Sequence, residues 1–96
     1  MEKTIEAYLR RRVKAAGGLA LKMVCPGWSG VPDRLVLLPG AGVFFAETKD
    51  AGKKPAKKQL YRHRQLRALG FRVYVPDSIA AVDEMLRDEG HEIHAT

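Results

Sequence analysis

The stretch that decides the fold is Gly30-Val31-Pro32-Asp33-Arg34, followed fourteen residues after its aspartate by Glu47-Thr48-Lys49. Two short apolar runs, residues 35–38 and 43–46, lie between these motifs, and Pro39-Gly40-Ala41-Gly42 separates the runs. Short β-branched and aromatic runs bounded by Pro and Gly are typical of strands joined by a turn. The segment therefore predicts a β-hairpin.

This hairpin would gather charged side chains at one end. Asp33 precedes the first strand, while Glu47 and Lys49 end the second, and an antiparallel return brings these ends together. Glu47 and Lys49 are two residues apart, so their side chains point to the same face. Two carboxylates and one ammonium group at one place predict metal-assisted cleavage of a phosphodiester.

Length and composition bound the class of protein. The chain has 96 residues, enough for one domain, and its 46% hydrophobic content argues against disorder. No apolar run approaches the roughly 18–20 residues that span a bilayer, and the chain starts without an apolar signal segment. The single cysteine, Cys25, excludes an internal disulfide, and the histidines show no zinc-ligand spacing. We expect a cytoplasmic protein with no membrane partner.

The net charge of +6 is concentrated in one part of the sequence. Nine Lys or Arg residues lie between Lys49 and Arg72, against the single acid Asp50. A solvated helix face is the plain interpretation for any one of them, but the block as a whole favours a nucleic acid, because Lys and Arg contacts to phosphate dominate such binding. The expected DNA-binding residues are Lys53, Lys54, Lys57, Lys58, Arg62, His63, Arg64 and Trp28.

Apolar periodicity and Gly or Pro breaks predict the remaining elements. The expected class is α/β, a mixed sheet flanked by helices in the order α-β-β-β-α-β-α. Helices are expected over residues 2–16 and 56–69, and from a cap at Asp77 or Ser78 to about residue 87. Strands are expected over residues 19–25, 35–38, 43–46 and 71–75. Residues 88–96 have the composition of a loose tail.

The motifs resemble a known family. Pro32-Asp33 followed by Glu47-x-Lys49 is similar to the PD-(D/E)xK nuclease signature, and with Gln59 the pattern resembles the virus-type replication-repair nuclease (VRR-NUC) domain over nearly all of residues 1–96. The resemblance implies a restriction-endonuclease-like fold and divalent-metal-dependent DNA cleavage. It also implies stand-alone phage or bacterial forms that act on branched DNA, such as Holliday junctions, as homodimers.

The expected cofactor is Mg²⁺, with Mn²⁺ able to substitute. Mg²⁺ takes oxygen ligands and keeps several waters, so two carboxylates, Asp33 and Glu47, would suffice. Lys49 would orient the attacking water or stabilise charge on the reacting phosphate. The backbone carbonyl of Thr48 is a further candidate ligand.

Two more residues are expected near the metal. Glu2 falls within the apolar stripe of the first helix and Glu6 at its edge, and a carboxylate facing the core is costly unless a metal or another group compensates it. Acids also favour a helix N-terminus for electrostatic reasons. The family carries a glutamate on this helix, which is Glu2 or Glu6 here. It also places a catalytic glutamine at the position of Gln59.

Several alternatives stay open. His63 could be an acid or base, or an exposed phosphate contact. Trp28 could stack on a base or wedge into a junction, or form a hydrophobic lid or a dimer contact. A homodimer is expected through the uncharged hairpin 35–45 and the Trp28 loop, unless the hairpin lies under the chain's own helices. The competing functions are a non-catalytic DNA-binding module and an RNA nuclease.

Overall fold

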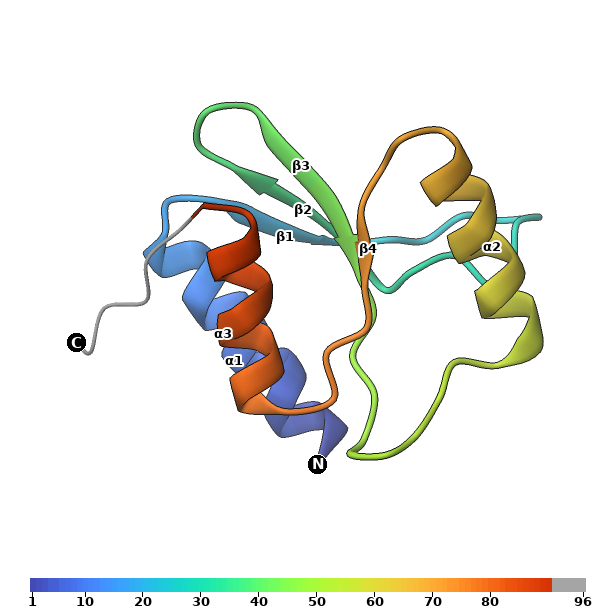
Figure 1. The fold of residues 1–96 in the computed structure, drawn as a ribbon, viewed down its shortest axis with the longest axis horizontal. Helices are drawn as coiled ribbons and strands as arrows, with labels where there is room; N and C mark the ends of the chain where they lie inside the picture. The colour runs from blue at the N-terminus through green and yellow to red at the C-terminus, as the bar shows by residue number, and fades with distance from the viewer. Residues whose placement is uncertain (91–96) are drawn as a thin grey trace.

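The computed structural model describes residues 1–90, which form a four-stranded sheet with three helices (Figure 1). The helices are α1 (Glu2–Ala15), α2 (Lys57–Ala68) and α3 (Ile79–Asp88), and the strands are β1 (Leu19–Lys22), β2 (Arg34–Leu38), β3 (Gly42–Ala46) and β4 (Val73–Tyr74). The α/β class and the order α-β-β-β-α-β-α are thereby confirmed. Within residues 1–90, no helix has the length and apolar content to cross a membrane.

The sheet has the order β1-β2-β3-β4. The first three strands are antiparallel, and β4 lies parallel to β3 after the crossover through α2. Arg34 is paired with Ala46, so the hairpin returns as expected, and Asp33 and Glu47 flank this pair. The register therefore places the two acidic motifs at the same end of the hairpin.

The two faces of the sheet pack against different helices. Alternate residues of β2 and β3, among them Val36 and Phe44, point into a dry core formed with α1 and α3. Leu9 of α1 is completely buried there, and Tyr8 donates a 2.6 Å hydrogen bond from its hydroxyl to Asp83 of α3. The helix α2 lies apart from these two helices, beyond β4 (Figure 1). By strand alternation Phe45 points to the α2 side.

The strand β4 is shorter than the expected 71–75. Two further backbone hydrogen bonds extend its pairing with the segment after β3. In these, Glu47 N–H donates to the Tyr74 carbonyl and Lys49 N–H donates to the Pro76 carbonyl. Pro76 has no N–H to donate in return, so the ladder ends there. Likewise β1 ends at Lys22 instead of residue 25, although Met23 N–H still donates to the Asp33 carbonyl.

The C-terminal region is ordered further than expected. Ser78 is the cap of α3, because its hydroxyl accepts a 3.0 Å hydrogen bond from Ala81 N–H. The helix runs to Asp88, and Glu89 accepts 2.6 Å hydrogen bonds from Arg72 and from the Tyr74 hydroxyl. The expectation that the tail loosens at residue 88 was therefore wrong, and residues 91–96 lie outside the described part of the chain.

Candidate active site

Three side chains meet at the end of the β2–β3 hairpin, and we call Asp33, Glu47 and Lys49 the acid–lysine cluster. Backbone hydrogen bonds hold both segments that carry it. Met23 N–H donates to the Asp33 carbonyl at 2.9 Å. On the other segment, Glu47 N–H donates to the carbonyl of Tyr74 in β4 at 3.0 Å, and Lys49 N–H donates to the carbonyl of Pro76 at 3.1 Å. The cluster therefore sits on fixed backbone, as an active site requires.

Glu47 is completely buried, which is unusual for a carboxylate. Its Oε1 lies 3.3 Å from Nε2 of His63, and its Oε2 lies 3.4 Å from Nζ of Lys49. Among the described residues Oε2 has no hydrogen-bond partner. Burial raises the pKa of Glu47, and Lys49 opposes this shift. Among the described residues, the Lys49 ammonium group is thus the one partner that offsets the negative charge on Oε2 of Glu47.

Asp33 shares this electrostatic environment. Burial raises the pKa of the Asp33 carboxyl most, the negative charge of Glu47 raises it further, and Lys49 lowers it. A carboxylate whose pKa is raised by a second carboxylate is stabilised in its ionised form by a cation placed beside both. The arrangement can therefore hold a positive ion between Asp33 and Glu47.

This donor set fits a hard divalent cation. In residues 1–90, no group of three or more His, Cys, Asp and Glu side chains is already arranged to hold a metal. Mg²⁺ needs only one or two carboxylates, because waters and a substrate phosphate complete its shell. The Oε2 of Glu47, which accepts no hydrogen bond from the described residues and faces only the Lys49 ammonium group, is a suitable oxygen ligand. Thr48, whose carbonyl is a candidate ligand, is buried beside it.

Both acids of α1 lie near the cluster. Glu2, Glu6 and Asp33 line one small cavity of about 200 Å³. The charge of Glu2 raises the pKa of Glu47, and that of Glu6 raises the pKa of Asp33. The expectation that Glu2 faces the core was wrong, because it is exposed and only the stripe from Ile5 onward is buried. Glu6 is half-buried and forms a 3.3 Å ion pair with Arg34.

His63 differs from its sequence-based interpretation. The structure buries it completely, so the expectation of an exposed phosphate contact was wrong. Burial lowers the pKa of His63, and the nearby charges of Arg67 and Lys49 lower it further. The contact with Glu47 is therefore a hydrogen bond from a neutral imidazole, with Nε2–H donating because a carboxylate can only accept. His63 orients the buried carboxylate, a role that the sequence analysis missed.

Gln59 has a structural partner in this structure. Its side-chain oxygen accepts a 2.7 Å hydrogen bond from Ala56 N–H at the start of α2. This is half of a capping box, because Ala56 has no side-chain acceptor with which to return the bond. The residue that the structure does bring to Glu47 from α2 is His63, one helical turn after Gln59. The expected placement of Gln59 beside the cluster is thus not accompanied by a contact to it.

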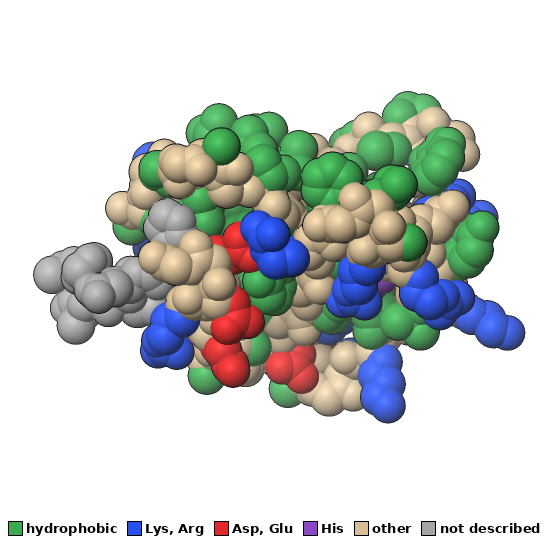
Figure 2. All heavy atoms as spheres, turned by 45° about the horizontal axis from the view of Figure 1, so that its top comes forward, with side chains coloured by type: hydrophobic (Ala, Val, Ile, Leu, Met, Phe, Trp, Pro, Cys, Tyr) green, Lys and Arg blue, Asp and Glu red, His purple; other side chains and the backbone are tan. Residues whose placement is uncertain are grey.

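The basic residues gather around α2. We call Lys53, Lys54, Lys57, Lys58, Arg62, Arg64 and Arg67 the basic segment, which contains no acid. Lys and Arg side chains lie along the α2 side of the molecule in Figure 2. Most of the segment is exposed, but the Arg62 Nε donates to the Ser29 carbonyl at 2.9 Å and its guanidinium lies 4.2 Å from the centre of the Trp28 ring. Arg62 therefore also fixes the Trp28 loop.

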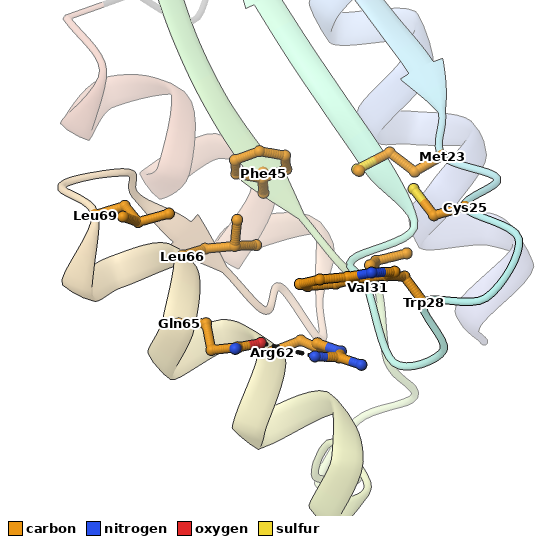
Figure 3. Close-up of a pocket in the computed structure, with 9 residues that line it drawn as sticks. All are labelled: Met23, Cys25, Trp28, Val31, Phe45, Arg62, Gln65, Leu66 and Leu69. Atoms are coloured by element: carbon orange, nitrogen blue, oxygen red, sulfur yellow. Dashed lines mark hydrogen bonds between the residues drawn. The ribbon is translucent and has the colours of Figure 1, made fainter.

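A pocket of about 440 Å³ lies between this loop, β3 and α2 (Figure 3). We call it the Trp28 pocket. The loop can approach α2 because Gly30 has a positive φ of 85°, and a Cβ there would lie 2.9 Å from the Lys58 carbonyl. The walls are almost entirely apolar. Residues lining the pocket are Met23, Cys25, Trp28, Val31, Phe45, Arg62, Gln65, Leu66 and Leu69.

Comparisons with known proteins show which family the chain resembles. The chain is 49% identical over 77 residues to a protein named "Putative nuclease p44" from Acyrthosiphon pisum secondary endosymbiont phage 1, a match that covers 80% of this chain and 83% of that one. It is also similar to a solved structure described as a VRR_NUC domain, with a TM-score of 0.86 and 38% identity over 90% of this chain and 94% of the other. No family model matches the chain.

Proposed function

The chain belongs to the VRR-NUC family of nucleases, and from this premise we propose that it is a metal-dependent, structure-selective DNA endonuclease. It hydrolyses phosphodiester bonds in branched DNA such as Holliday junctions. The observation that carries the proposal is the buried Glu47, whose Oε2 has no hydrogen-bond partner among the described residues, beside the second carboxylate of Asp33. A protein that only bound DNA would have no need of two carboxylates turned toward phosphate.

In the proposed mechanism Asp33 and Glu47 would hold Mg²⁺, and the Thr48 carbonyl and either Glu2 or Glu6 would be further ligands. Such an ion, for which Mn²⁺ could substitute, would supply charge neutralisation and activation of a water. His63 keeps the Glu47 carboxylate in one orientation through its 3.3 Å contact. Lys49, held 3.4 Å from Glu47, stabilises the negative charge that develops on the reacting phosphate.

The substrate approaches along α2. The basic segment and Trp28 lie on the side of the molecule that carries His63 and Glu47. A DNA strand whose phosphates bind the basic segment would therefore extend to the acid–lysine cluster. Gln59 starts the same helix, and its amide N–H₂ group is proposed to contact the phosphate. We propose that the protein acts in the cytoplasm of a bacterial or phage-infected cell, where such DNA is present.

The experiment that tests the function compares supercoiled plasmid, a four-way junction, linear duplex and RNA. Each is incubated with the full chain in Mg²⁺, in Mn²⁺ and in EDTA. The proposal expects cleavage of the junction in either metal and none in EDTA. Binding without cleavage in any metal would favour the DNA-binding module, and cleavage restricted to RNA would favour the RNA nuclease.

We propose that the chain acts as a homodimer, in which two active sites face two strands. The structure buries Val36, Leu38 and Phe44 of the hairpin under α1 and α3, so these cannot form the contact. The opposite face of the sheet carries an apolar row across three strands, in which Leu19 pairs with Leu37 and Leu37 with Val43. Leu19 is 58% exposed. Figure 2 shows hydrophobic side chains gathered along the upper part of the molecule.

Covering such a row with a second copy removes apolar surface from water. Light scattering tests this proposal, and a single species near the chain mass of 10.7 kDa would contradict it. Leu19→Lys together with Leu37→Lys should convert a dimer to a monomer. Leu60→Lys, on the exposed side of α2, is the control for an added charge.

A further inference from the structure

We propose that the Trp28 pocket binds an unpaired nucleobase of the DNA, next to the phosphate that is cut. This inference rests on the proposed nuclease function and adds a base-binding subsite to it. The pocket has the volume of an ordinary ligand site, and its walls are almost entirely apolar. A nucleobase in a fully paired duplex cannot enter it, so the ligand is a base that has left the stack.

The position of the pocket relative to the acid–lysine cluster supports this occupant. Val31 and Phe45 line the pocket, and each stands two residues before a carboxylate of the cluster. On the extended backbone at the end of β3, residues two apart, such as Phe45 and Glu47, point to the same side and are separated by about 6–7 Å. A nucleotide with its phosphate at Asp33 and Glu47 can therefore place a neighbouring base against Val31 and Phe45.

The aromatic wall is built before any ligand arrives. Trp28 is 54% exposed on a loop, yet the Arg62 guanidinium holds it at 4.2 Å and also binds the Ser29 carbonyl and the Gln65 side-chain oxygen. Figure 3 draws the ring with Arg62 on one side and with Met23 and Phe45 on the other. The indole face turned away from Arg62 lies toward Met23 and Phe45, which line the same pocket, and stacking on such a face tolerates any base.

Charge favours nucleic acid over a second copy of the chain as the occupant. The helix that forms one wall carries most of the basic segment, which has seven cations and no acid. Two copies docked through this wall would oppose two positive helices, whereas a DNA strand would neutralise them. Self-association through the pocket is the rival that the experiment must separate.

Trp28 is the only tryptophan of the chain, so its fluorescence reports on the pocket directly. The full chain is titrated in EDTA with two labelled junctions that differ at one position, which holds an unpaired thymine in one and an abasic sugar in the other. Fluorescence anisotropy gives each Kd. We expect quenching of Trp28 and roughly tenfold tighter binding with the thymine, and neither with the abasic sugar.

Variants assign the effect to the pocket. Trp28→Ala should erase the tenfold preference, and so should Leu69→Gln, which lies on the exposed rim and leaves the fold intact. Tyr61→Ala is the matched control, since Tyr61 is 50% exposed and also contacts Arg62 but does not line the pocket. It should keep the preference.

Equal Kd values and equal emission for the two junctions would overturn the inference. A halved mass of Trp28→Ala in light scattering would also overturn it, in favour of self-association. Cleavage of both junctions in Mg²⁺ is measured in parallel. Quenching without cleavage would retain the base site and reject the nuclease, whereas cleavage without base preference would do the reverse.

Discussion

The two faces of the central sheet are built from different chemistry. On the face under α1 and α3, Leu9, Val36 and Phe44 are completely buried among other hydrocarbon side chains. On the face toward α2, the completely buried side chains include Glu47 and His63, and an apolar pocket lies open beside them. The first face supplies the free energy of folding, and the second holds groups whose burial opposes folding.

The raised pKa values of Asp33 and Glu47 follow from this difference between the two faces. Asp33 and Glu47 have raised pKa values because the fold removes water from their carboxylates. Their ionised forms therefore cost stability at neutral pH, and this contribution becomes more unfavourable as pH rises through the interval from the ordinary to the raised pKa. Substitutions on the two faces should consequently have opposite effects on stability, which the following experiments test.

The largest expected effect is on cleavage. Glu47→Gln and Asp33→Asn should each slow cleavage about a thousand-fold or more, because each removes a ligand for the metal. In the absence of metal each should raise the Tm by a few degrees, since an unfavourable buried charge is gone. Thermal melting and cleavage of a junction are measured together. Glu84→Gln, an exposed acid of α3, is the control, and a lowered Tm for both site variants would contradict the comparison.

The apolar face should respond in the opposite way. Phe44→Ala should lower the free energy of unfolding by about 3–5 kcal/mol, because it opens a cavity in the core. Leu69→Ala, on the α2 side and 74% exposed, should change it by less than about 0.5 kcal/mol. Urea unfolding gives both values. Similar costs for the two variants would mean that the α2 side contributes more to folding than its open pocket indicates.

Binding of DNA should depend on charge around α2 alone. Replacing Lys53, Lys54, Lys57 and Lys58 by Ala should weaken binding to every sequence and reduce the slope of log K against log salt by up to about 3.6. The matched control removes four exposed cations from α1: Lys3, Arg10, Arg11 and Lys14. An equal change of slope in both variants would show a diffuse effect of net charge and reject a specific DNA-binding side.

The smallest effect concerns His63. Its lowered pKa means that the fold holds the neutral imidazole, so its contribution to stability is present above the ordinary pKa of about 6.5 and is lost as pH falls below it. The stability difference between the wild type and His63→Gln should therefore shrink as pH falls from 7.5 to 5.5. Urea unfolding at three pH values measures this difference. Asp33 and Glu47 also titrate, but they are present in both proteins, so their contribution cancels in the difference. A constant difference would indicate that His63 does not titrate in the fold.

The sequence was sufficient for the hairpin and for the meeting of Asp33 with Glu47, because two short apolar runs joined by one Pro-Gly turn predict antiparallel strands whose outer ends meet. It was also sufficient for the apolar stripe Ile5, Leu9 and Val13 of α1. These features depend on residues that are close together in the sequence, within one helix or one hairpin.

Features that need two distant segments could not be predicted in the same way. The buried residue of α2 is His63, and its neighbours in the sequence are charged. The helix therefore has no apolar stripe from which its orientation could be predicted. The signal available was that His63 lies four residues after Gln59 and thus on the same helix face. Glu2 lies inside the calculated stripe of α1, but the core begins only at Ile5. The Trp28 pocket arises where a loop meets a helix, which periodicity does not describe.

The parallel pairing of β3 with β4 has a consequence for the order of folding. The N–H groups of Glu47 and Lys49 are held by the carbonyls of Tyr74 and Pro76, which the chain reaches only after the whole crossover through α2. Such non-local contacts form late. A chain that ends at residue 70 thus carries every cation of the basic segment but lacks the carbonyls that hold Glu47 and Lys49. On the proposed function, a purified fragment of this length should bind nucleic acid without hydrolysing it.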